Sequence, residues 1–189
     1  MPYYNKPPQR GLAAHFAEVA THGGLPVIMY NVPGRTITSM NLETAVALSK
    51  VKNIIGIKEA SGDVSFDEKL KQSVATDFAM LSGDDPTYIP FLKIGGNGLI
   101  SVMSNMMTPH CTRWTKLCAD GKWSEAETDF SKYKQIISLM YCEANPIPLK
   151  WMMYKMGLMQ SPEMRLPLVT LESTYHEVIF SEMKKLELI

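Results

Sequence analysis

The fold of this chain is decided by the stretch Asn53-Ile54-Ile55-Gly56-Ile57-Lys58-Glu59-Ala60-Ser61-Gly62-Asp63. Its β-branched run is too short for a helix, and the Ser-Gly-Asp that follows is typical of a turn, so the run predicts a strand. Because strand side chains alternate, we expect Ile54, Gly56 and Lys58 on one face and Ile55 and Ile57 on the other. Both faces are apolar up to the lysine, which indicates a parallel strand buried on both sides.

The lysine at the end of this strand is the candidate reactive group. Gly56 is expected to leave space beneath Lys58, and burial at a strand end disfavours the ammonium form, which lowers the pKa of the amine. A neutral amine can attack a carbonyl carbon and form a Schiff base. The alternative is a strand-end lysine whose stem packs against the protein while its charged head reaches water.

The composition is that of an ordinary globular protein of 189 residues, long enough for a hydrophobic core. Lys and Arg together number 19, as do Asp and Glu, so charge gives no reason to expect nucleic acid or an anionic membrane as a partner. No apolar run approaches the ~20 residues of a membrane span, and the first residues lack a signal peptide's apolar core. Cys111, Cys118 and Cys142 lack CxxC spacing, so we expect reduced thiols in a cytoplasmic protein.

Strands and helices are expected to alternate over residues 1–120. The sequence predicts strands at 26–30, 53–58, 78–82 and 98–102. Predicted helices are 11–22, 41–50, 65–74, 86–94 and 108–118, with Asn41, Ser65 and Asp85 among their N-caps. Residues 31–36 are expected to form a loop. After residue 121 the pattern is only helical, with a capping box at Ser124 and Glu127 and a break at Asn145-Pro146. We therefore divide the chain into a βα region, 1–120, and a helical appendage, 121–189.

Four βα units imply a parallel sheet with helices outside it. A doubly wound fold would show a glycine-rich phosphate loop after a strand, and no such motif is present. Polar residues instead recur at the carboxyl ends of the strands, including Tyr30 with Arg35, Lys58, Gly83-Asp84 and Ser101. A (β/α)8 barrel keeps its active site at that end, and a whole barrel needs about 250 residues. We expect the second half of such a barrel.

The motifs together resemble one enzyme family. They are Pro2-Tyr3-Tyr4-Asn5-Lys6-Pro7, Tyr30-Asn31-Val32-Pro33-Gly34-Arg35-Thr36, Gly56-Ile57-Lys58-Glu59-Ala60-Ser61-Gly62-Asp63, Leu81-Ser82-Gly83-Asp84-Asp85, Gly98-Leu99-Ile100-Ser101-Val102 and Asn145-Pro146-Ile147-Pro148-Leu149-Lys150-Trp151. In this order and spacing they resemble the dihydrodipicolinate synthase (4-hydroxy-tetrahydrodipicolinate synthase) family of pyruvate-dependent class I aldolase-type lyases. The resemblance covers the carboxyl-terminal two-thirds of the family pattern and essentially all of this chain.

The resemblance implies catalytic and substrate-binding roles for residues of the strand ends. Lys58 matches the lysine that forms the Schiff base with pyruvate, and Tyr30 matches the tyrosine that passes protons during addition and cyclisation. Arg35 matches the arginine that holds the carboxylate of aspartate semialdehyde. Gly83 and the Ile100 backbone match positions that line the pyruvate end of the pocket.

The resemblance also implies contacts outside a single subunit. Tyr4 matches a tyrosine that reaches into a neighbouring subunit's site, and Tyr3 matches a position near a lysine feedback site. The family is tetrameric, so we expect a homo-oligomer. No cofactor or metal is implied beyond the covalent imine with the substrate.

Each candidate residue also has a simpler interpretation. Arg35 could be a solvated loop charge, although a planar guanidinium suits bidentate carboxylate binding. Tyr30 could be a barrel-core aromatic, because an unperturbed phenol, with a pKa near ~10, relays protons only within a hydroxyl chain. Helix capping explains Asp84-Asp85 better than a metal site does.

The sequence departs from the family pattern in one segment, and three hypotheses for its function remain open. The family's Gly-Thr-Thr segment, whose threonine partners the tyrosine of the relay, does not occur in this sequence. The first hypothesis is a lyase that condenses pyruvate with aspartate semialdehyde in diaminopimelate and lysine biosynthesis. The second is a truncated, catalytically impaired fragment of that synthase. The third is a sister aldolase such as N-acetylneuraminate lyase, which Arg35 disfavours because those enzymes recognise polyhydroxylated substrates at that position.

Overall fold

The computed structural model describes residues 1–189, which form two compact units. Unit 1 comprises Met1–Ile100 and unit 2 comprises Ser101–Ile189. This boundary lies before the helix that ends at Ala119, whereas the sequence-based division lies after it.

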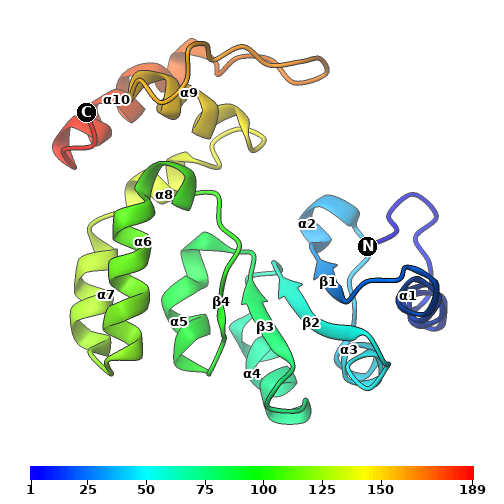
Figure 1. Ribbon diagram of the computed structural model, residues 1–189. Coiled ribbons are helices and arrows are strands. Elements are labelled where there is room, and N and C mark those ends of the chain that lie inside the picture. The colour runs from blue at the N-terminus through cyan, green and yellow to red at the C-terminus, as the bar shows by residue number, and fades with distance from the viewer. The chain divides into compact units, whose positions relative to one another are not determined.

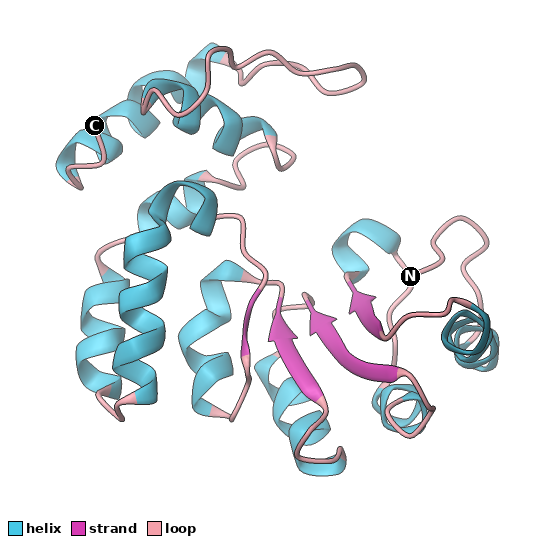
Figure 2. Ribbon diagram, viewed as in Figure 1, coloured by secondary structure: helices cyan, strands magenta, loops and turns pink.

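Unit 1 is built around a four-stranded parallel sheet in the order β1-β2-β3-β4 (Figures 1 and 2). The strands are β1 (Val27–Asn31), β2 (Ile54–Glu59), β3 (Ala79–Ser82) and β4 (Gly98–Leu99). The helices are α1 (Gln9–His22), α2 (Pro33–Thr36), α3 (Leu42–Leu48), α4 (Val64–Ser73) and α5 (Tyr88–Lys93), with a 3-10 turn, η1, at Asp85–Thr87. Neighbouring strands follow one another in the sequence, as the barrel prediction requires.

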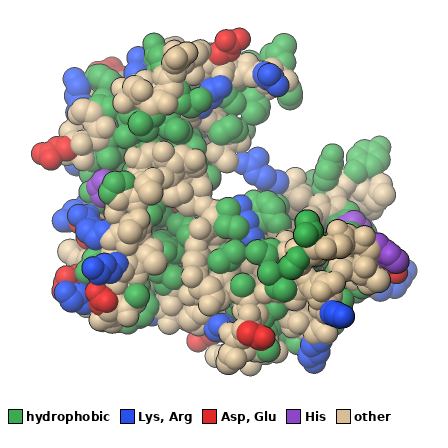
Figure 3. Space-filling model, viewed as in Figure 1, with side chains coloured by type: hydrophobic (Ala, Val, Ile, Leu, Met, Phe, Trp, Pro, Cys, Tyr) green, Lys and Arg blue, Asp and Glu red, His purple; other side chains and the backbone are tan.

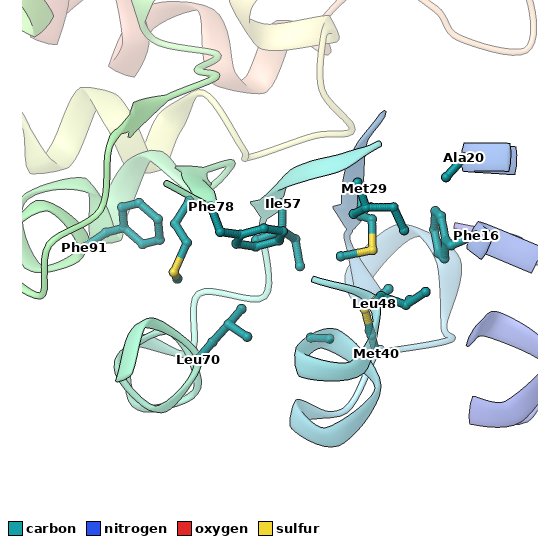
Figure 4. Close-up of a cluster of buried hydrophobic side chains, with 12 residues drawn as sticks. Phe16, Ala20, Met29, Met40, Leu48, Ile57, Leu70, Phe78 and Phe91 are labelled. Carbon is teal, nitrogen blue, oxygen red and sulfur yellow. The ribbon is translucent and has the colours of Figure 1, made fainter. Parts of the chain in front are cut away.

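The hydrophobic core of unit 1 lies between the sheet and the helices α1, α3, α4 and α5 (Figure 4). Met29, Ile57 and Met80 of the first three strands are fully buried there. The helices contribute residues such as Phe16, Leu48, Leu70 and Phe91. We call this side of the sheet the packed face, and the opposite side, which carries Tyr30 and Lys58, the open face.

A β-bulge in β2 corrects the predicted alternation. Val27 lies opposite Ile54, but Ile28 lies opposite Gly56, so Ile55 is the extra residue. Ile54 therefore joins Ile57 in the core, and Ile55 is 47% exposed. The prediction that Ile54 shares the face of Lys58 was wrong, because strict alternation does not hold across a bulge. Hydrophobic side chains gather at the surface of unit 1 over β1 and β2 (Figure 3).

Several predicted helix starts differ from the observed ones. Asn41 caps α3 as expected, accepting a hydrogen bond from the backbone N–H of Thr44. The cap of α4 is Asp63 rather than Ser65, and the cap of η1 is Asp84 rather than Asp85. An aspartate just before the turn reaches the free N–H groups better than the predicted residue inside it. Part of the predicted loop 31–36 forms the short helix α2.

Unit 2 is helical. Its elements are α6 (Ser104–Ala119), α7 (Trp123–Ser131), α8 (Lys134–Leu139), α9 (Ile147–Lys155), η2 (Ser173–Tyr175) and α10 (His176–Lys185). Met107 has non-helical angles inside α6, one residue before the predicted start at Thr108. The capping box at Ser124 was wrong, because α7 already begins at Trp123. Asp129 ties α6 to α7 by accepting hydrogen bonds from Arg113 and, at 2.6 Å, from the indole N–H of Trp114.

None of the helices combines the length and apolar character needed to cross a membrane.

Candidate active site

Lys58 and Tyr30 lie side by side at the carboxyl ends of β2 and β1. The two residues are register partners in the parallel pair. The Lys58 Nζ atom lies 4.2 Å from the centre of the Tyr30 ring, within the range of a cation–π contact. Both side chains are half-buried on the open face. The sheet therefore holds an amine against a phenol ring at its carboxyl end, as the sequence led us to expect.

Gly83 provides the space that the lysine side chain occupies. A Cβ atom at this position would lie 2.7 Å from Lys58 Cε and 2.7 Å from the Cβ atom of Ala60. The turn after β3 can therefore pass close to the lysine only because residue 83 has no side chain. Gly56 does not have the role predicted for it. A Cβ atom there would lie 2.5 Å from the Ala79 carbonyl oxygen, so the space is filled by the β3 backbone.

Backbone hydrogen bonds fix the turns around the lysine. The Gly83 N–H donates to the Glu59 carbonyl at 2.6 Å, and the Ile100 N–H donates to the Ser82 carbonyl at 2.8 Å. The predicted pocket residues Gly83 and Ile100 are thus attached directly to the strand ends. Lys58, Tyr30 and Gly83 come together in unit 1, and Ile100 follows at the end of the next strand.

The remaining predicted residues, Arg35 and Tyr4, lie on other segments of unit 1. Arg35 is exposed in the last turn of α2, which follows β1. Tyr4 is 87% exposed in the segment before α1. It lines a hollow of about 450 Å³ together with Met1, Pro2, Tyr3, Asn5 and His15. Tyr4 therefore faces outward, as the predicted role in a neighbouring subunit requires.

A buried polar pair on the packed face was not predicted from the sequence. The Asn31 side-chain amide donates to Glu59 Oε2 at 2.7 Å, and the Ser61 N–H donates to Glu59 Oε1 at 2.6 Å. Burial raises the pKa of Glu59, and the hydrogen bonds from Asn31 and Ser61 oppose that rise. The signal was present, because alternation from Ile57 places a glutamate on the packed face of the strand.

A second buried carboxylate, Asp67 of α4, has a different environment. It is 3% exposed, and its Oδ1 atom makes no hydrogen bond. Burial raises the pKa of Asp67 to about 7, with added effects from the charges of Glu59, Asp63 and Asp84. The predicted capping role of the Asp84-Asp85 pair is seen at Asp84, which accepts from the Thr87 backbone N–H at 3.2 Å. No set of three or more His, Cys, Asp or Glu side chains is arranged to hold a metal ion.

Sequence comparison identifies a matching family and several relatives. The sequence model of the Dihydrodipicolinate synthetase family matches residues 1–186. The chain is 46% identical over 185 residues to a 4-hydroxy-tetrahydrodipicolinate synthase of Bdellovibrio bacteriovorus, covering 98% of this chain and 63% of that protein. It is 43% identical over 183 residues to the Shewanella pealeana synthase, covering 97% of this chain and 62% of that protein. The chain thus spans less than two-thirds of these relatives' length.

Solved structures give the same result. A chloride-inhibited dihydrodipicolinate synthase from Acinetobacter baumannii, complexed with pyruvate, has a TM-score of 0.95 and 37% identity, covering 100% of this chain and 65% of that one. The enzyme from Cyanidioschyzon merolae with lysine bound has a TM-score of 0.93 and 36% identity, covering 100% of this chain and 64% of that one. These neighbours confirm the prediction of a partial (β/α)8 barrel.

Proposed function

Because this chain belongs to the dihydrodipicolinate synthetase family, we propose that it carries the imine-forming site of a 4-hydroxy-tetrahydrodipicolinate synthase. The reaction is the condensation of pyruvate with aspartate semialdehyde in lysine biosynthesis. The observation that carries this proposal is the amine of Lys58 at the carboxyl end of β2, beside the Tyr30 ring and against Gly83. A parallel barrel sheet places reactive groups at this end of its strands.

The proposed chemistry begins with a neutral Lys58 amine. Nζ attacks the keto carbon of pyruvate, and loss of one water gives an imine between enzyme and substrate. Loss of a proton from the substrate methyl group gives an enamine, whose carbon attacks the aldehyde carbon of aspartate semialdehyde. The Tyr30 hydroxyl is the proposed proton carrier for these steps, because its ring lies against the amine. No metal or cofactor enters this scheme.

The remaining predicted residues have proposed roles at the edge of the site. Arg35 would bind the carboxylate of aspartate semialdehyde, since an exposed guanidinium can form two parallel hydrogen bonds with it. Tyr4 would complete the site of a second copy of the chain, in a homo-oligomer, which its exposure allows. Lysine would act as an effector at the hollow that Tyr3 lines.

Borohydride trapping tests the imine directly. The protein is incubated with pyruvate, reduced, and analysed by peptide mass spectrometry. We expect a gain of one pyruvate, less one water and plus two hydrogens, on the peptide that carries Lys58. Lys58→Arg should abolish the adduct. Lys71→Arg is the matched control, because the half-buried Lys71 side chain also packs on a glycine, Gly95. An adduct on other lysines alone would refute the proposal.

Turnover needs a separate measurement, since the chain spans only part of its relatives. Condensation of pyruvate with aspartate semialdehyde should be assayed for the chain alone and for the chain mixed with the part of the Bdellovibrio bacteriovorus relative that it does not match. Turnover in either case, but not with N-acetylneuraminate, supports the synthase. Trapping without turnover in both cases would favour the impaired fragment. Cleavage of N-acetylneuraminate would favour the sister aldolase.

A further inference from the structure

The buried pair Asn31 and Glu59 lies directly behind the proposed reactive pair. Tyr30 and Lys58 are register partners, and the next register partners along the same strands are Asn31 and Glu59. Their side chains point to the packed face, where Asn31 is 1% exposed and Glu59 is 2% exposed. The Asn31 amide donates to Glu59 Oε2 at 2.7 Å, which links β1 to β2 at the point where both strands end.

The other hydrogen bonds of this pair reach the segments that frame the site. Glu59 Oε1 accepts from the Ser61 N–H at 2.6 Å, and Asn31 Oδ1 accepts from the Met40 N–H at 3.0 Å. The Glu59 carbonyl also accepts from the Gly83 N–H, and Gly83 packs against Lys58. One buried pair therefore fixes the ends of β1 and β2, the turn after β2 and the loop before α3.

Stability alone does not account for a glutamate at this position. Its partners are the neutral amide of Asn31 and neutral groups of Ala60 and Ser61, with no cation among them. A buried carboxylate without a cation costs several kcal/mol in desolvation, and a hydrophobic pair of similar volume is often as stable or more stable. What such a pair provides is a fixed geometry, because both carboxylate oxygens are held by directional hydrogen bonds.

We propose that Glu59 and Asn31 are positioning residues, which hold the Lys58 amine against the Tyr30 ring in the arrangement that imine formation requires. This inference rests on the proposed function. Neither residue touches the substrate. They act through the backbone, by setting the register and separation of the strand ends that carry Lys58 and Tyr30.

Reversing the direction of the central hydrogen bond tests this proposal. In Glu59→Gln, the new amide can satisfy either Asn31 or the Ser61 N–H, but its NH2 group then faces another donor. In Asn31→Asp, two carboxylates face each other. In the double variant, the amide introduced at position 59 would donate to the carboxylate introduced at position 31, while the N–H groups of Ser61 and Met40 keep their acceptors. The single variants break the network, and the double variant restores it with donor and acceptor exchanged.

The first readout is the rate of borohydride trapping at saturating pyruvate. A misplacement of reacting groups by about 1 Å can cost about 100-fold in rate. We therefore expect each single variant to trap at least about tenfold more slowly, with a smaller change in the half-saturating pyruvate concentration. The double variant should return to within about threefold of the unmodified protein. Asn53→Asp is the control. The Asn53 side-chain amide donates a hydrogen bond to the Ala20 carbonyl at the amino end of β2, which is the end opposite to Lys58.

The second readout needs no pyruvate chemistry. The Tyr30 ring should shift the NMR signals of the Lys58 side chain upfield, and Lys58→Arg assigns them. We expect this ring-current shift to fall in the single variants and return in the double variant. Folded single variants with an unchanged shift and unchanged trapping would overturn the proposal. So would a double variant that regains thermal stability but not the shift. An unmodified protein that shows the shift but never traps pyruvate would refute the proposed function alone, and the shifts would still decide the positioning role.

Discussion

The two faces of the unit 1 sheet differ in what their side chains do. On the packed face, Met29, Ile57 and Met80 are fully buried against four helices. On the open face, Tyr30 and Lys58 are half-buried at the strand ends, and the isoleucines before them are partly exposed. The packed face therefore supplies most of the burial that stabilises unit 1, while the open face carries the groups with reactive chemistry.

The largest effect should come from a truncation on the packed face. Ile57→Ala removes a side chain with no exposed surface, and we expect it to lower the free energy of unfolding by about 3 kcal/mol, from lost burial plus a cavity. Urea unfolding followed by circular dichroism measures this change. A loss below about 1 kcal/mol would mean that the core around Ile57 relaxes freely, which would contradict its close packing.

Gly83→Ala should change the open face instead. The added Cβ would meet Lys58 Cε and Ala60 Cβ at 2.7 Å, so we expect the lysine side chain to shift from its place beside Tyr30. We expect pyruvate trapping to slow by about 10- to 100-fold. Gly11→Ala is the control, because a Cβ there meets only ordinary contacts, at 3.5 Å or more. If the Gly83→Ala protein were trapped as fast as the unmodified protein, Gly83 would not be needed to make space for the Lys58 side chain.

Asp67→Asn should change how the stability of the folded protein depends on pH. The folded-state pKa of Asp67 is about 7, above its ordinary value of 3.8. Between these values the folded protein binds a proton that the unfolded chain does not, so stability falls as pH rises. Above pH 7 the loss is complete, and below about pH 4 it is absent.

The neutral amide in Asp67→Asn avoids this loss. The variant should therefore unfold at a higher temperature than the unmodified protein at pH 8, and at a similar temperature at pH 4. Thermal unfolding at both pH values measures the difference. If the two proteins were equally stable at pH 8, the cost of burying the ionised Asp67 carboxylate would have to be offset by other interactions in the folded protein.

The fold was largely predictable because it depends on local signals. Turn residues and apolar runs placed all four strands within a few residues, and the absence of a phosphate loop favoured a barrel. The bulge at Ile55 was not predictable, since it depends on the pairing of β2 with β1 rather than on the β2 sequence alone. The same is true of Gly56, whose neighbour is the backbone of another strand.

The site was predictable only where a motif named the residue. The strand-end pattern singled out Lys58 and Tyr30, the resemblance assigned their roles, and the structure brings them together. The Asn31–Glu59 pair was missed, because alternation indicates that Glu59 is buried but not which polar group of the neighbouring strand faces it. Asp67 was missed for a similar reason. A single aspartate in a helical pattern gives no sign that its oxygen will be buried without a partner.

The smallest effect is expected from Ile55→Ala, which is the same substitution as Ile57→Ala on the other face of β2. Ile55 is 47% exposed, so about half of its transfer free energy is at stake, and no closed cavity forms. We expect a loss below about 1 kcal/mol, measured by the same urea unfolding. A loss equal to that of Ile57→Ala would mean that other protein packs over the open face in solution. The experiment should then be repeated at several protein concentrations, because a face covered by a second copy gives a concentration-dependent loss.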